Sequence, residues 1–164
     1  MSFSIIAAVG RNMELGKKGQ LCFRLPEDMK YFKQTTLDHP VIMGGNTFRS
    51  LKAPLPGRTN VVLSRSDDFP EDVVVIHSLM EAINEFSRLE DEVFVIGGGA
   101  IYEMFLPFCD KIYLTEIEAF DKEADVFFLK FDQGNYEKTV VSSGKSKNHG
   151  IPYDMVVYTK KEGL

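Results

Sequence analysis

The 164-residue sequence predicts an α/β fold with a mainly parallel sheet and helices on its faces. Short runs rich in Val and Ile alternate along the chain with segments of helical periodicity. Several of these runs are apolar on both faces, as strands are when helices cover both sides of a sheet. The C-terminal part differs: two strand-like runs follow one another across a polar, glycine-containing stretch. That pattern predicts a hairpin and an antiparallel end to the sheet.

The expected elements follow this pattern in order along the chain. Strands are expected over residues 3–9, 40–43, 60–63, 73–76, 93–96, 111–117, 136–142 and 153–160. Helices or helical turns are expected over residues 26–36, 47–51, 79–88 and 100–105. The segment 10–20 holds three glycines and several charges. We interpret it as a surface loop or, alternatively, as a flap over a binding site. Because no repeat, linker or domain boundary is visible, residues 1–164 are expected to form one domain.

Composition and charge are ordinary for a globular protein, with 44% hydrophobic and 26% charged residues. The net charge of −5 argues against a nucleic-acid-binding surface, which is usually basic. The first ten residues lack a basic segment and are interpreted as a strand rather than a signal peptide. No apolar run is long enough to span a bilayer. We therefore expect a cytoplasmic protein without membrane or nucleic-acid partners, and a monomer is also expected.

Cysteine and histidine usage gives no sign of a disulfide framework or a metal site. Cys22 and Cys109 are the two cysteines and lie far apart, which fits a reducing compartment. His39, His77 and His149 show no metal-like spacing. We therefore assign no metal.

A carboxylate on an apolar helix face is the most informative feature of the sequence. The run from Leu25 to Phe32 is typical of a helix start, because its second residue is proline and two acidic residues follow. Leu25, Met29 and Phe32 mark the apolar face, and Asp28 lies on or beside it, whereas Glu27 is expected to point to water. A buried carboxylate is costly unless a protein group or a ligand satisfies it.

Two strand-to-helix junctions are rich in glycine. They are Gly44-Gly45-Asn46-Thr47 and Gly97-Gly98-Gly99-Ala100-Ile101-Tyr102. Glycine lets backbone N–H groups approach a phosphate, and ligands of open α/β sheets bind at the carboxyl ends of strands. Neither junction is a GxGxxG fingerprint, because Tyr102 stands where the third glycine would be. Plain turn chemistry explains one such junction, but two on adjacent units favour a diphosphate between them.

Side chains near these junctions allow two interpretations each. Asn46 or Thr47 would cap the short helix, or the Thr47 hydroxyl would serve a phosphate oxygen. Ser64 and Arg65 are either a polar strand end or a site for an extra phosphate, which would select NADP over NAD. Arg58 follows a proline-rich apolar loop and is either a solvated charge or a two-pronged clamp for a carboxylate.

Five motifs together make the chain resemble dihydrofolate reductase over nearly its full length. They are Leu-Pro-Glu-Asp-Met-Lys-Tyr-Phe-Lys, Val-Ile-Met-Gly, Pro-Leu-Pro-Gly-Arg, Val-Val-Leu-Ser-Arg and Val-Ile-Gly-Gly-Gly-Ala-Ile-Tyr, in this order. The resemblance implies an eight-stranded sheet with seven parallel strands and the last antiparallel. It also implies hydride transfer from NADPH to dihydrofolate, with an adenosine-binding subdomain at roughly 39–89.

The resemblance also implies a role for each matching position. Asp28 matches the carboxylate that holds the pterin, Thr115 the hydroxyl beside it, Phe23 the position of a flap tryptophan, and Arg58 the grip on the glutamate tail. The apolar walls around the substrate match Ile6, Ala8, Met29, Phe32, Leu51 and Leu55. Contacts to NADPH are implied for Ala8, Leu15, Gly16, Gly44, Gly45, Asn46, Thr47, Leu63, Ser64, Arg65, Ile96, Gly97, Gly98, Gly99, Ala100, Ile101 and Tyr102. Of these, Ser64 and Arg65 match the 2′-phosphate site, and the Gly97–Gly98 pair matches one joined by a cis peptide.

Three departures from the family pattern fall close to the implied site. Phe23 stands where the family usually has Trp, so the indole N–H donor is lost, and Cys22 replaces a Pro. Gly45 stands where an Arg commonly binds the 2′-phosphate, and Arg49 or His77 is a candidate to compensate. The departures keep a non-catalytic nucleotide-binding module open as an alternative.

For the reaction itself, we expect hydride to pass from nicotinamide C4 to pterin C6, so the protein must stack the two rings and exclude water. Asp28 would act electrostatically, because it holds the far side of the pterin, and water would protonate N5. A pyrimidine reductase on the same fold is a further alternative, against which the Asp28 motif and the Arg58 loop argue.

Overall fold

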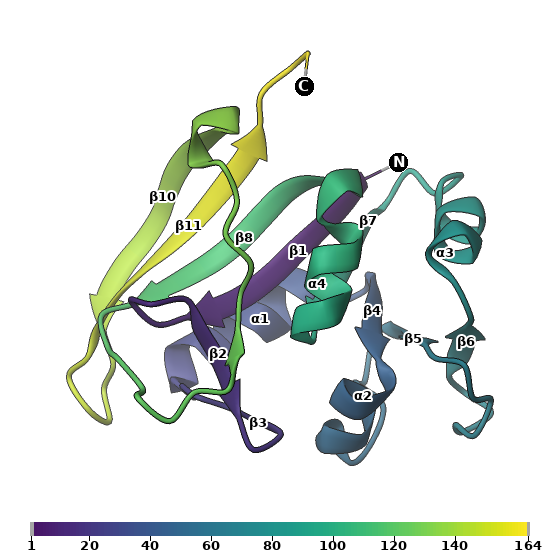
Figure 1. Ribbon diagram of the computed structural model, residues 1–164, viewed down its shortest axis with the longest axis horizontal. Helices are drawn as coiled ribbons and strands as arrows, with labels where there is room; N and C mark the ends of the chain where they lie inside the picture. The colour runs from purple at the N-terminus through teal and green to yellow at the C-terminus, as the bar shows by residue number, and fades with distance from the viewer. Residues whose placement is uncertain (1, 164) are drawn as a thin grey trace.

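The structure, a computed structural model, describes residues 2–163 and is centred on one eight-stranded sheet (Figure 1). The strand order is β10-β11-β8-β1-β7-β4-β5-β6. The strands are β1 (Ser2–Val9), β4 (Pro40–Gly44), β5 (Thr59–Leu63), β6 (Val74–Ile76), β7 (Glu92–Gly97), β8 (Cys109–Ile117), β10 (Tyr136–Lys145) and β11 (Pro152–Lys160). Strand β11 pairs antiparallel with β8 and β10, and the other neighbouring pairs are parallel. The predicted fold class is thereby confirmed.

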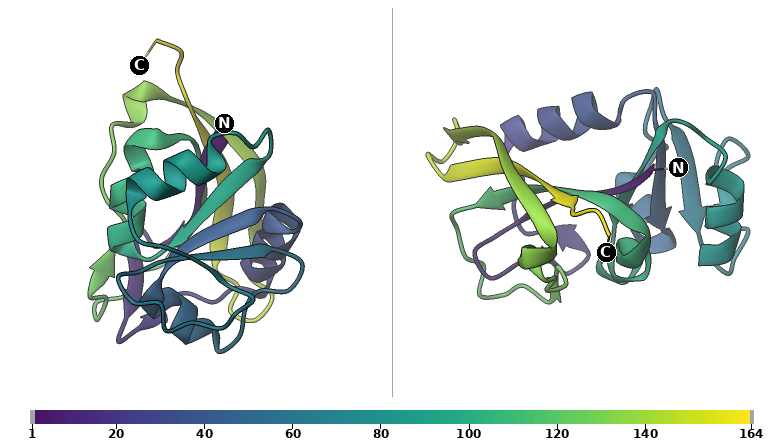
Figure 2. Two further views of the ribbon diagram at one scale, coloured as in Figure 1. Left: turned by 90° about the vertical axis from the view of Figure 1, so that its right-hand side faces the viewer. Right: turned by 90° about the horizontal axis from the view of Figure 1, so that it is seen from above.

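Four α-helices cover the two faces of the sheet. They are α1 (Pro26–Thr36), α2 (Gly45–Leu51), α3 (Leu79–Phe86) and α4 (Gly99–Phe105), with 3-10 turns at η1 (Leu106–Phe108) and η2 (Gln133–Asn135). Helix α1 lies behind the sheet in Figure 1 and α4 in front of it, and the view from above in Figure 2 separates them again. None of the helices in residues 2–163 is long and apolar enough to cross a membrane.

The helix boundaries follow local chemistry. Helix α1 begins at Pro26, as predicted, because proline has no N–H to lose at the first helical position. Helix α3 begins after Ser78, whose hydroxyl accepts a 3.1 Å hydrogen bond from the Glu81 N–H. It ends at Phe86, two residues before the predicted end. Helix α2 begins at Gly45, earlier than predicted, so neither Asn46 nor Thr47 is its cap.

Segment 10–20, expected to be a surface loop or a flap, contains strands that were not predicted. The segment contains β2 (Glu14–Lys17) and β3 (Gln20–Leu21), which join β9 (Val126–Phe127) in a small second sheet of order β3-β2-β9. Strand β2 carries Gly16 and Lys17 rather than a clear alternating pattern, β3 and β9 are two residues long, and β9 lies far along the chain. The pairing therefore has little local signature. We call residues 10–22 the flap from here on.

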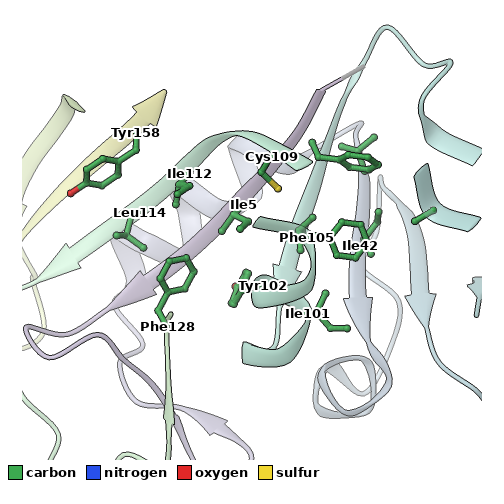
Figure 3. Packing of buried hydrophobic residues seen from close by; sticks show 14 of the residues in the cluster. Ile5, Ile42, Ile101, Tyr102, Phe105, Cys109, Ile112, Leu114, Phe128 and Tyr158 are labelled. Carbon is green, nitrogen blue, oxygen red and sulfur yellow. The ribbon is translucent and has the colours of Figure 1, made fainter. Parts of the chain in front are cut away.

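The core consists of two clusters, one on each face of the sheet, because alternate strand residues point in opposite directions. On β7, Val93 and Val95 join the larger cluster, whereas Phe94 joins the smaller one. Figure 3 shows the larger cluster, in which Tyr102 and Phe105 of α4 face the sheet. The smaller cluster receives side chains from α1 and α2, and it includes Ile6, Phe32, Leu51, Leu55 and Ile96.

Phe105 offers a direct check of the larger cluster. It is 0% exposed, and its ring meets Phe3 edge-on at 5.7 Å between centroids. We expect Phe105→Ala to lower the free energy of unfolding by about 3–5 kcal/mol. The matched change Met80→Ala, at a side chain 60% exposed, should cost no more than about 0.5 kcal/mol. Urea unfolding of both variants measures the difference, and equal losses would contradict this packing.

Candidate functional site

The Asp28 carboxylate lies between helix α1 and the end of strand β8. The Thr115 hydroxyl, itself 2% exposed, donates a 2.6 Å hydrogen bond to Asp28 Oδ1. Burial raises the pKa of the Asp28 carboxyl, and this hydrogen bond offsets part of the rise. No ion pair within residues 2–163 includes Asp28. The structure thus brings the predicted pair together and leaves the carboxylate without a cation.

Strand β1 and helix α4 border this carboxylate. Ala8 pairs in register with Thr115, so β1 lies directly beside the hydroxyl. Tyr102, buried at 5% exposure, donates a 2.8 Å hydrogen bond from its hydroxyl to the Ile6 carbonyl. Burial raises the pKa of the Tyr102 hydroxyl, and the Asp28 charge adds a smaller rise. Tyr102 therefore holds the Ile6 carbonyl in place. Its hydroxyl is also close enough to Asp28 for that charge to act on it.

Four of the six side chains predicted as apolar walls gather on the α1 face, and Ala8 and Met29 are not part of that cluster. Ile6, Phe32, Leu51 and Leu55 belong to the smaller core cluster. Met29 does not, because 54% of it is exposed. Met29 is therefore not a core residue. An exposed apolar side chain on the helix that carries Asp28 suits a surface that an apolar ligand covers.

Glu27 differs from the expectation that it points to water. Its Oε2 accepts a 2.9 Å hydrogen bond from the Lys147 N–H, which ties helix α1 to the loop between β10 and β11. Its Oε1 is buried and has no hydrogen-bond partner within residues 2–163. The helical spacing was sound, but it could not show that this distant loop packs over the helix start.

Arg58 is held by its neighbours in a fixed orientation. Its Nε donates to the Pro56 carbonyl at 3.0 Å, and its Nη1 donates to the Thr36 hydroxyl at 3.2 Å. The loop is fixed in turn by Asn60, which is 3% exposed and bonds Leu55 N at 2.9 Å, Leu55 O at 2.9 Å and Arg58 O at 3.1 Å. Sequence reasoning missed Asn60, although a polar residue at the start of an apolar strand was the available signal.

The two glycine junctions lie side by side at the carboxyl ends of β4 and β7. Met43 pairs with Gly97 in register, and a methyl group at Gly98 would lie 3.5 Å from the Thr47 hydroxyl oxygen. The Gly97–Gly98 peptide is cis, and φ at Gly97 is 124°, a conformation that favours glycine. The predicted adjacency is confirmed, and a side chain at Gly98 would point from one junction towards Thr47 of the other.

The guanidinium of Arg49 occupies the space beside Gly45, where a side chain at position 45 would lie. A methyl group at Gly45 would lie 3.2 Å from Arg49 Nη1, 3.3 Å from Phe69 Cζ and 3.7 Å from Ser64 Oγ. The Arg49 guanidinium lies 5.1 Å from the centroid of the Phe69 ring, which holds it over that ring.

The remaining candidates near Gly45 are occupied or exposed. His77 Nε2 lies 2.7 Å from Asp67 Oδ1, so His77 faces a carboxylate. Arg65, Asn46 and Ala100 are exposed. Of the two candidates to compensate for Gly45, the geometry therefore favours Arg49.

The flap brings Phe23 to strand β1. A methyl group at Gly10 would lie 2.7 Å from Phe23 Cε2, so the ring packs against the glycine backbone. The Cys22 N–H donates a 2.9 Å hydrogen bond to the Leu15 carbonyl, which links Phe23 to the start of the flap. Within residues 2–163, no cluster of three or more His, Cys, Asp or Glu side chains could hold a metal ion.

Comparisons with known proteins point in one direction. A family model described as dihydrofolate reductase matches residues 2–160. The Haemophilus influenzae dihydrofolate reductase is 42% identical over 84% of each chain, and that of Bacillus subtilis is 38% identical over 96% of this chain and 94% of its own. The solved structure of the Enterococcus faecalis dihydrofolate reductase, complexed with NADP(H) and RAB-propyl, aligns with a TM-score of 0.89. It is 30% identical and covers 98% of this chain and 97% of its own.

The raised pKa of Asp28 makes a prediction about stability. The folded state holds the proton more tightly than the unfolded state, whose carboxyl titrates at about 3.9. Stability is therefore lost as the pH rises through the interval between the unfolded pKa and the raised folded pKa. An asparagine does not titrate, so the Asp28→Asn variant does not lose stability in this interval. We expect its free energy of unfolding to exceed that of wild type at neutral pH, and the difference to disappear at acid pH. Denaturant unfolding across pH measures it, and a pH-independent difference would contradict it.

Proposed function

The chain belongs to the dihydrofolate reductase family, and from that premise we propose how its residues reduce dihydrofolate. It is an enzyme with dihydrofolate reductase activity, and its cofactor is NADPH. In the reaction, 7,8-dihydrofolate, NADPH and a proton give 5,6,7,8-tetrahydrofolate and NADP⁺. The observation that carries the proposal is the Asp28–Thr115 pair: a largely buried carboxylate with one hydroxyl donor and no ion-pair partner within residues 2–163.

Asp28 would hold the pterin rather than donate a proton. Its Oδ1 is engaged by Thr115, and the carboxylate retains capacity to accept further bonds from the pterin 2-amino group and N3–H. Those bonds satisfy a charge that burial penalises, so substrate binding removes a cost already present in the free protein. Because Asp28 then lies on the far side of the ring from N5, we propose that water supplies the N5 proton.

The residues around Asp28 would orient the two rings. Ile6, Phe32, Leu51 and Leu55 give apolar surface for the pterin and benzoyl groups, and exposed Met29 would be covered on binding. Arg58, fixed by Pro56 and Thr36, would hold the glutamate tail. These assignments are supported by the clustering of the side chains on the α1 face of the sheet.

The glycine junctions fit the diphosphate of NADPH, which supplies the hydride. The close approach of the two junctions, in which a methyl group at Gly98 would lie 3.5 Å from the Thr47 hydroxyl oxygen, is the observation that supports this fit. The Thr47 hydroxyl would donate to a phosphate oxygen, and Leu15 and Gly16 of the flap would flank the nicotinamide ring. Tyr102 would act by fixing Ile6 rather than by proton transfer, because its hydroxyl is already bonded.

The adenosine half is assigned to residues 39–89, which include β4, α2, β5, β6 and α3. Within it, Ser64, Arg65 and Arg49 would bind the 2′-phosphate. Arg49 would replace the arginine that the family commonly has at position 45. It lies one helical turn further along, and its guanidinium reaches the space beside Gly45. A monomeric state stays a prediction, and so does a cytoplasmic location, with which the free thiols of Cys22 and Cys109 are consistent.

The activity is tested by following NADPH oxidation with and without dihydrofolate. We expect oxidation that depends on dihydrofolate and is much slower with NADH. Oxidation that ignores dihydrofolate would contradict the proposal and favour a non-catalytic nucleotide-binding module.

Asp28→Asn tests the anchoring role. We expect the rate of hydride transfer at neutral pH to fall by about 10²-fold, because an electrostatic interaction with the reacting ring is lost. The dissociation constant of NADPH should stay within about twofold of wild type. The matched control is Glu27→Gln, the neighbouring carboxylate of the same helical turn, which should keep the wild-type rate. Equal losses of NADPH affinity and rate in Asp28→Asn would argue against this role.

Arg49→Ala tests cofactor selection. Losing a charged hydrogen bond to the 2′-phosphate should weaken NADP⁺ binding by about tenfold or more and leave NAD⁺ binding unchanged. Arg88→Ala, at an exposed arginine that follows helix α3 and is not among the residues assigned to the 2′-phosphate, is the control and should change neither. Adding Gly45→Arg to Arg49→Ala should restore NADP⁺ affinity, because the new guanidinium enters the space that Arg49 leaves. Calorimetric titration measures these affinities, and an unchanged NADP⁺ affinity in Arg49→Ala would exclude the assignment.

A further inference from the structure

Glu14 is a buried carboxylate that the proposed reaction does not use. It is the first residue of β2 and is 1% exposed. The ion pairs found within residues 2–163 do not include it, and the nearby cation Lys17 is paired with Asp121 at 2.8 Å instead. Burying a carboxylate without a cation costs free energy that hydrogen bonds must offset.

The two oxygens of Glu14 join two segments that are far apart in sequence. Oε1 accepts a 2.7 Å hydrogen bond from the Asn12 N–H, which belongs to the flap. Oε2 accepts a 2.7 Å hydrogen bond from the Asp121 N–H, which belongs to the loop between β8 and β9. Each bond has a charged acceptor and the short length expected of a strong interaction. Through Asp121 this carboxylate clasps the flap to residues 118–125, which we call the clasp loop, beside backbone hydrogen bonds from Arg11 N–H to Ala119 O and from Asp125 N–H to Gly16 O.

The same carboxylate lies where the flap meets strand β1. A methyl group at Gly10 would lie 2.6 Å from Glu14 Oε1, 2.7 Å from Ala119 O and 2.7 Å from Phe23 Cε2. The carboxylate and the Phe23 ring therefore pack against the same glycine. Moving the carboxylate changes the support of Phe23 and, through Leu15, the course of the flap.

We propose that Glu14 is a positioning residue for hydride transfer, which holds the flap against the clasp loop so that Leu15, Gly16 and Phe23 flank the nicotinamide ring. This inference rests on the proposed function, because it concerns the geometry of the same reaction. Glu14 touches neither substrate nor cofactor and acts through the flap. It accepts hydrogen bonds from two backbone N–H groups. The flap is therefore held without an indole N–H donor at position 23.

The chemistry requires a carboxylate at this position. A glutamine has one acceptor oxygen, and its NH₂ group would face one of the two N–H donors. A leucine fills the volume but leaves both N–H groups without a partner, and they regain one only by turning to water. Either change favours an open flap, even where the rest of the fold stays intact.

The Glu14→Gln variant distinguishes an effect on binding of the nicotinamide half of the cofactor from an effect on binding of its adenosine half. We expect the dissociation constant of NADPH to rise about tenfold, whereas that of 2′,5′-ADP, which has no nicotinamide, stays within about twofold. Single-turnover hydride transfer at saturating NADPH should slow by a similar factor. An effect confined to folding stability would move none of these ratios, so equal affinities for NADPH in variant and wild type would overturn the proposal.

Glu118→Gln is the matched control. Glu118 Oε1 lies 3.2 Å from Arg11 Nη2 and joins the same two segments, but both side chains are about half exposed, at 53% and 52%. A solvated pair contributes little, so this variant should bind NADPH as wild type does. If it loses as much affinity as Glu14→Gln, any link between the segments suffices and the role assigned to Glu14 is wrong.

Glu14→Leu covers the case in which Glu14→Gln does not fold, because an apolar side chain of similar size removes the cost of the buried charge. A folded Glu14→Leu variant with full NADPH affinity would overturn the proposal. In the wild-type protein, hydrogen exchange at Asn12 and Asp121 decides whether the clasp forms: both amides should be protected, and exchange as fast as in an open loop would refute it. A wild type that binds NADPH but does not reduce dihydrofolate would refute the proposed function and leave the clasp intact.

Discussion

The hydrogen bond between the Thr115 hydroxyl and Asp28 is the interaction around which the site is organised. It joins the start of α1 to the end of β8 at 2.6 Å, and it leaves a carboxylate that burial penalises. An apolar side chain at this position would avoid the cost of burying a charge and would favour stability. In the function proposed here, a bound pterin would remove this cost, so the affinity for the substrate and the unfavourable burial of the carboxylate would have the same origin.

Two departures from the family pattern have counterparts elsewhere in the chain. Gly45 has no side chain, yet Arg49, held over Phe69, places a guanidinium at the same point. Phe23 has no N–H group, yet the neighbouring flap is clasped by the carboxylate of Glu14. In both cases a different residue would meet the proposed requirement: Arg49 would supply a cation for the 2′-phosphate, and Glu14 would fix the course of the flap.

Elements with strong local signals could be predicted from the sequence, and those that depend on distant partners could not. Helix α1 begins and ends as predicted, because Pro26 and the apolar spacing are local signals. The glycine junctions meet as expected, since strand ends of a parallel sheet share an edge. Strand β2 was missed because its partner β9 lies far along the chain. Glu27 was misplaced because the loop that covers it follows β10.

The central claim is that Asp28 is a costly carboxylate which the pterin satisfies. Its most direct test is an NMR titration of the Asp28 carboxyl carbon in the free enzyme and in complexes with NADP⁺ alone and with NADP⁺ and folate. We expect a pKa above the ordinary range for aspartate in the free enzyme and in the NADP⁺ complex. With folate bound, the pKa should fall, because hydrogen bonds to the charged form stabilise it. A pKa that folate leaves unchanged would contradict the account.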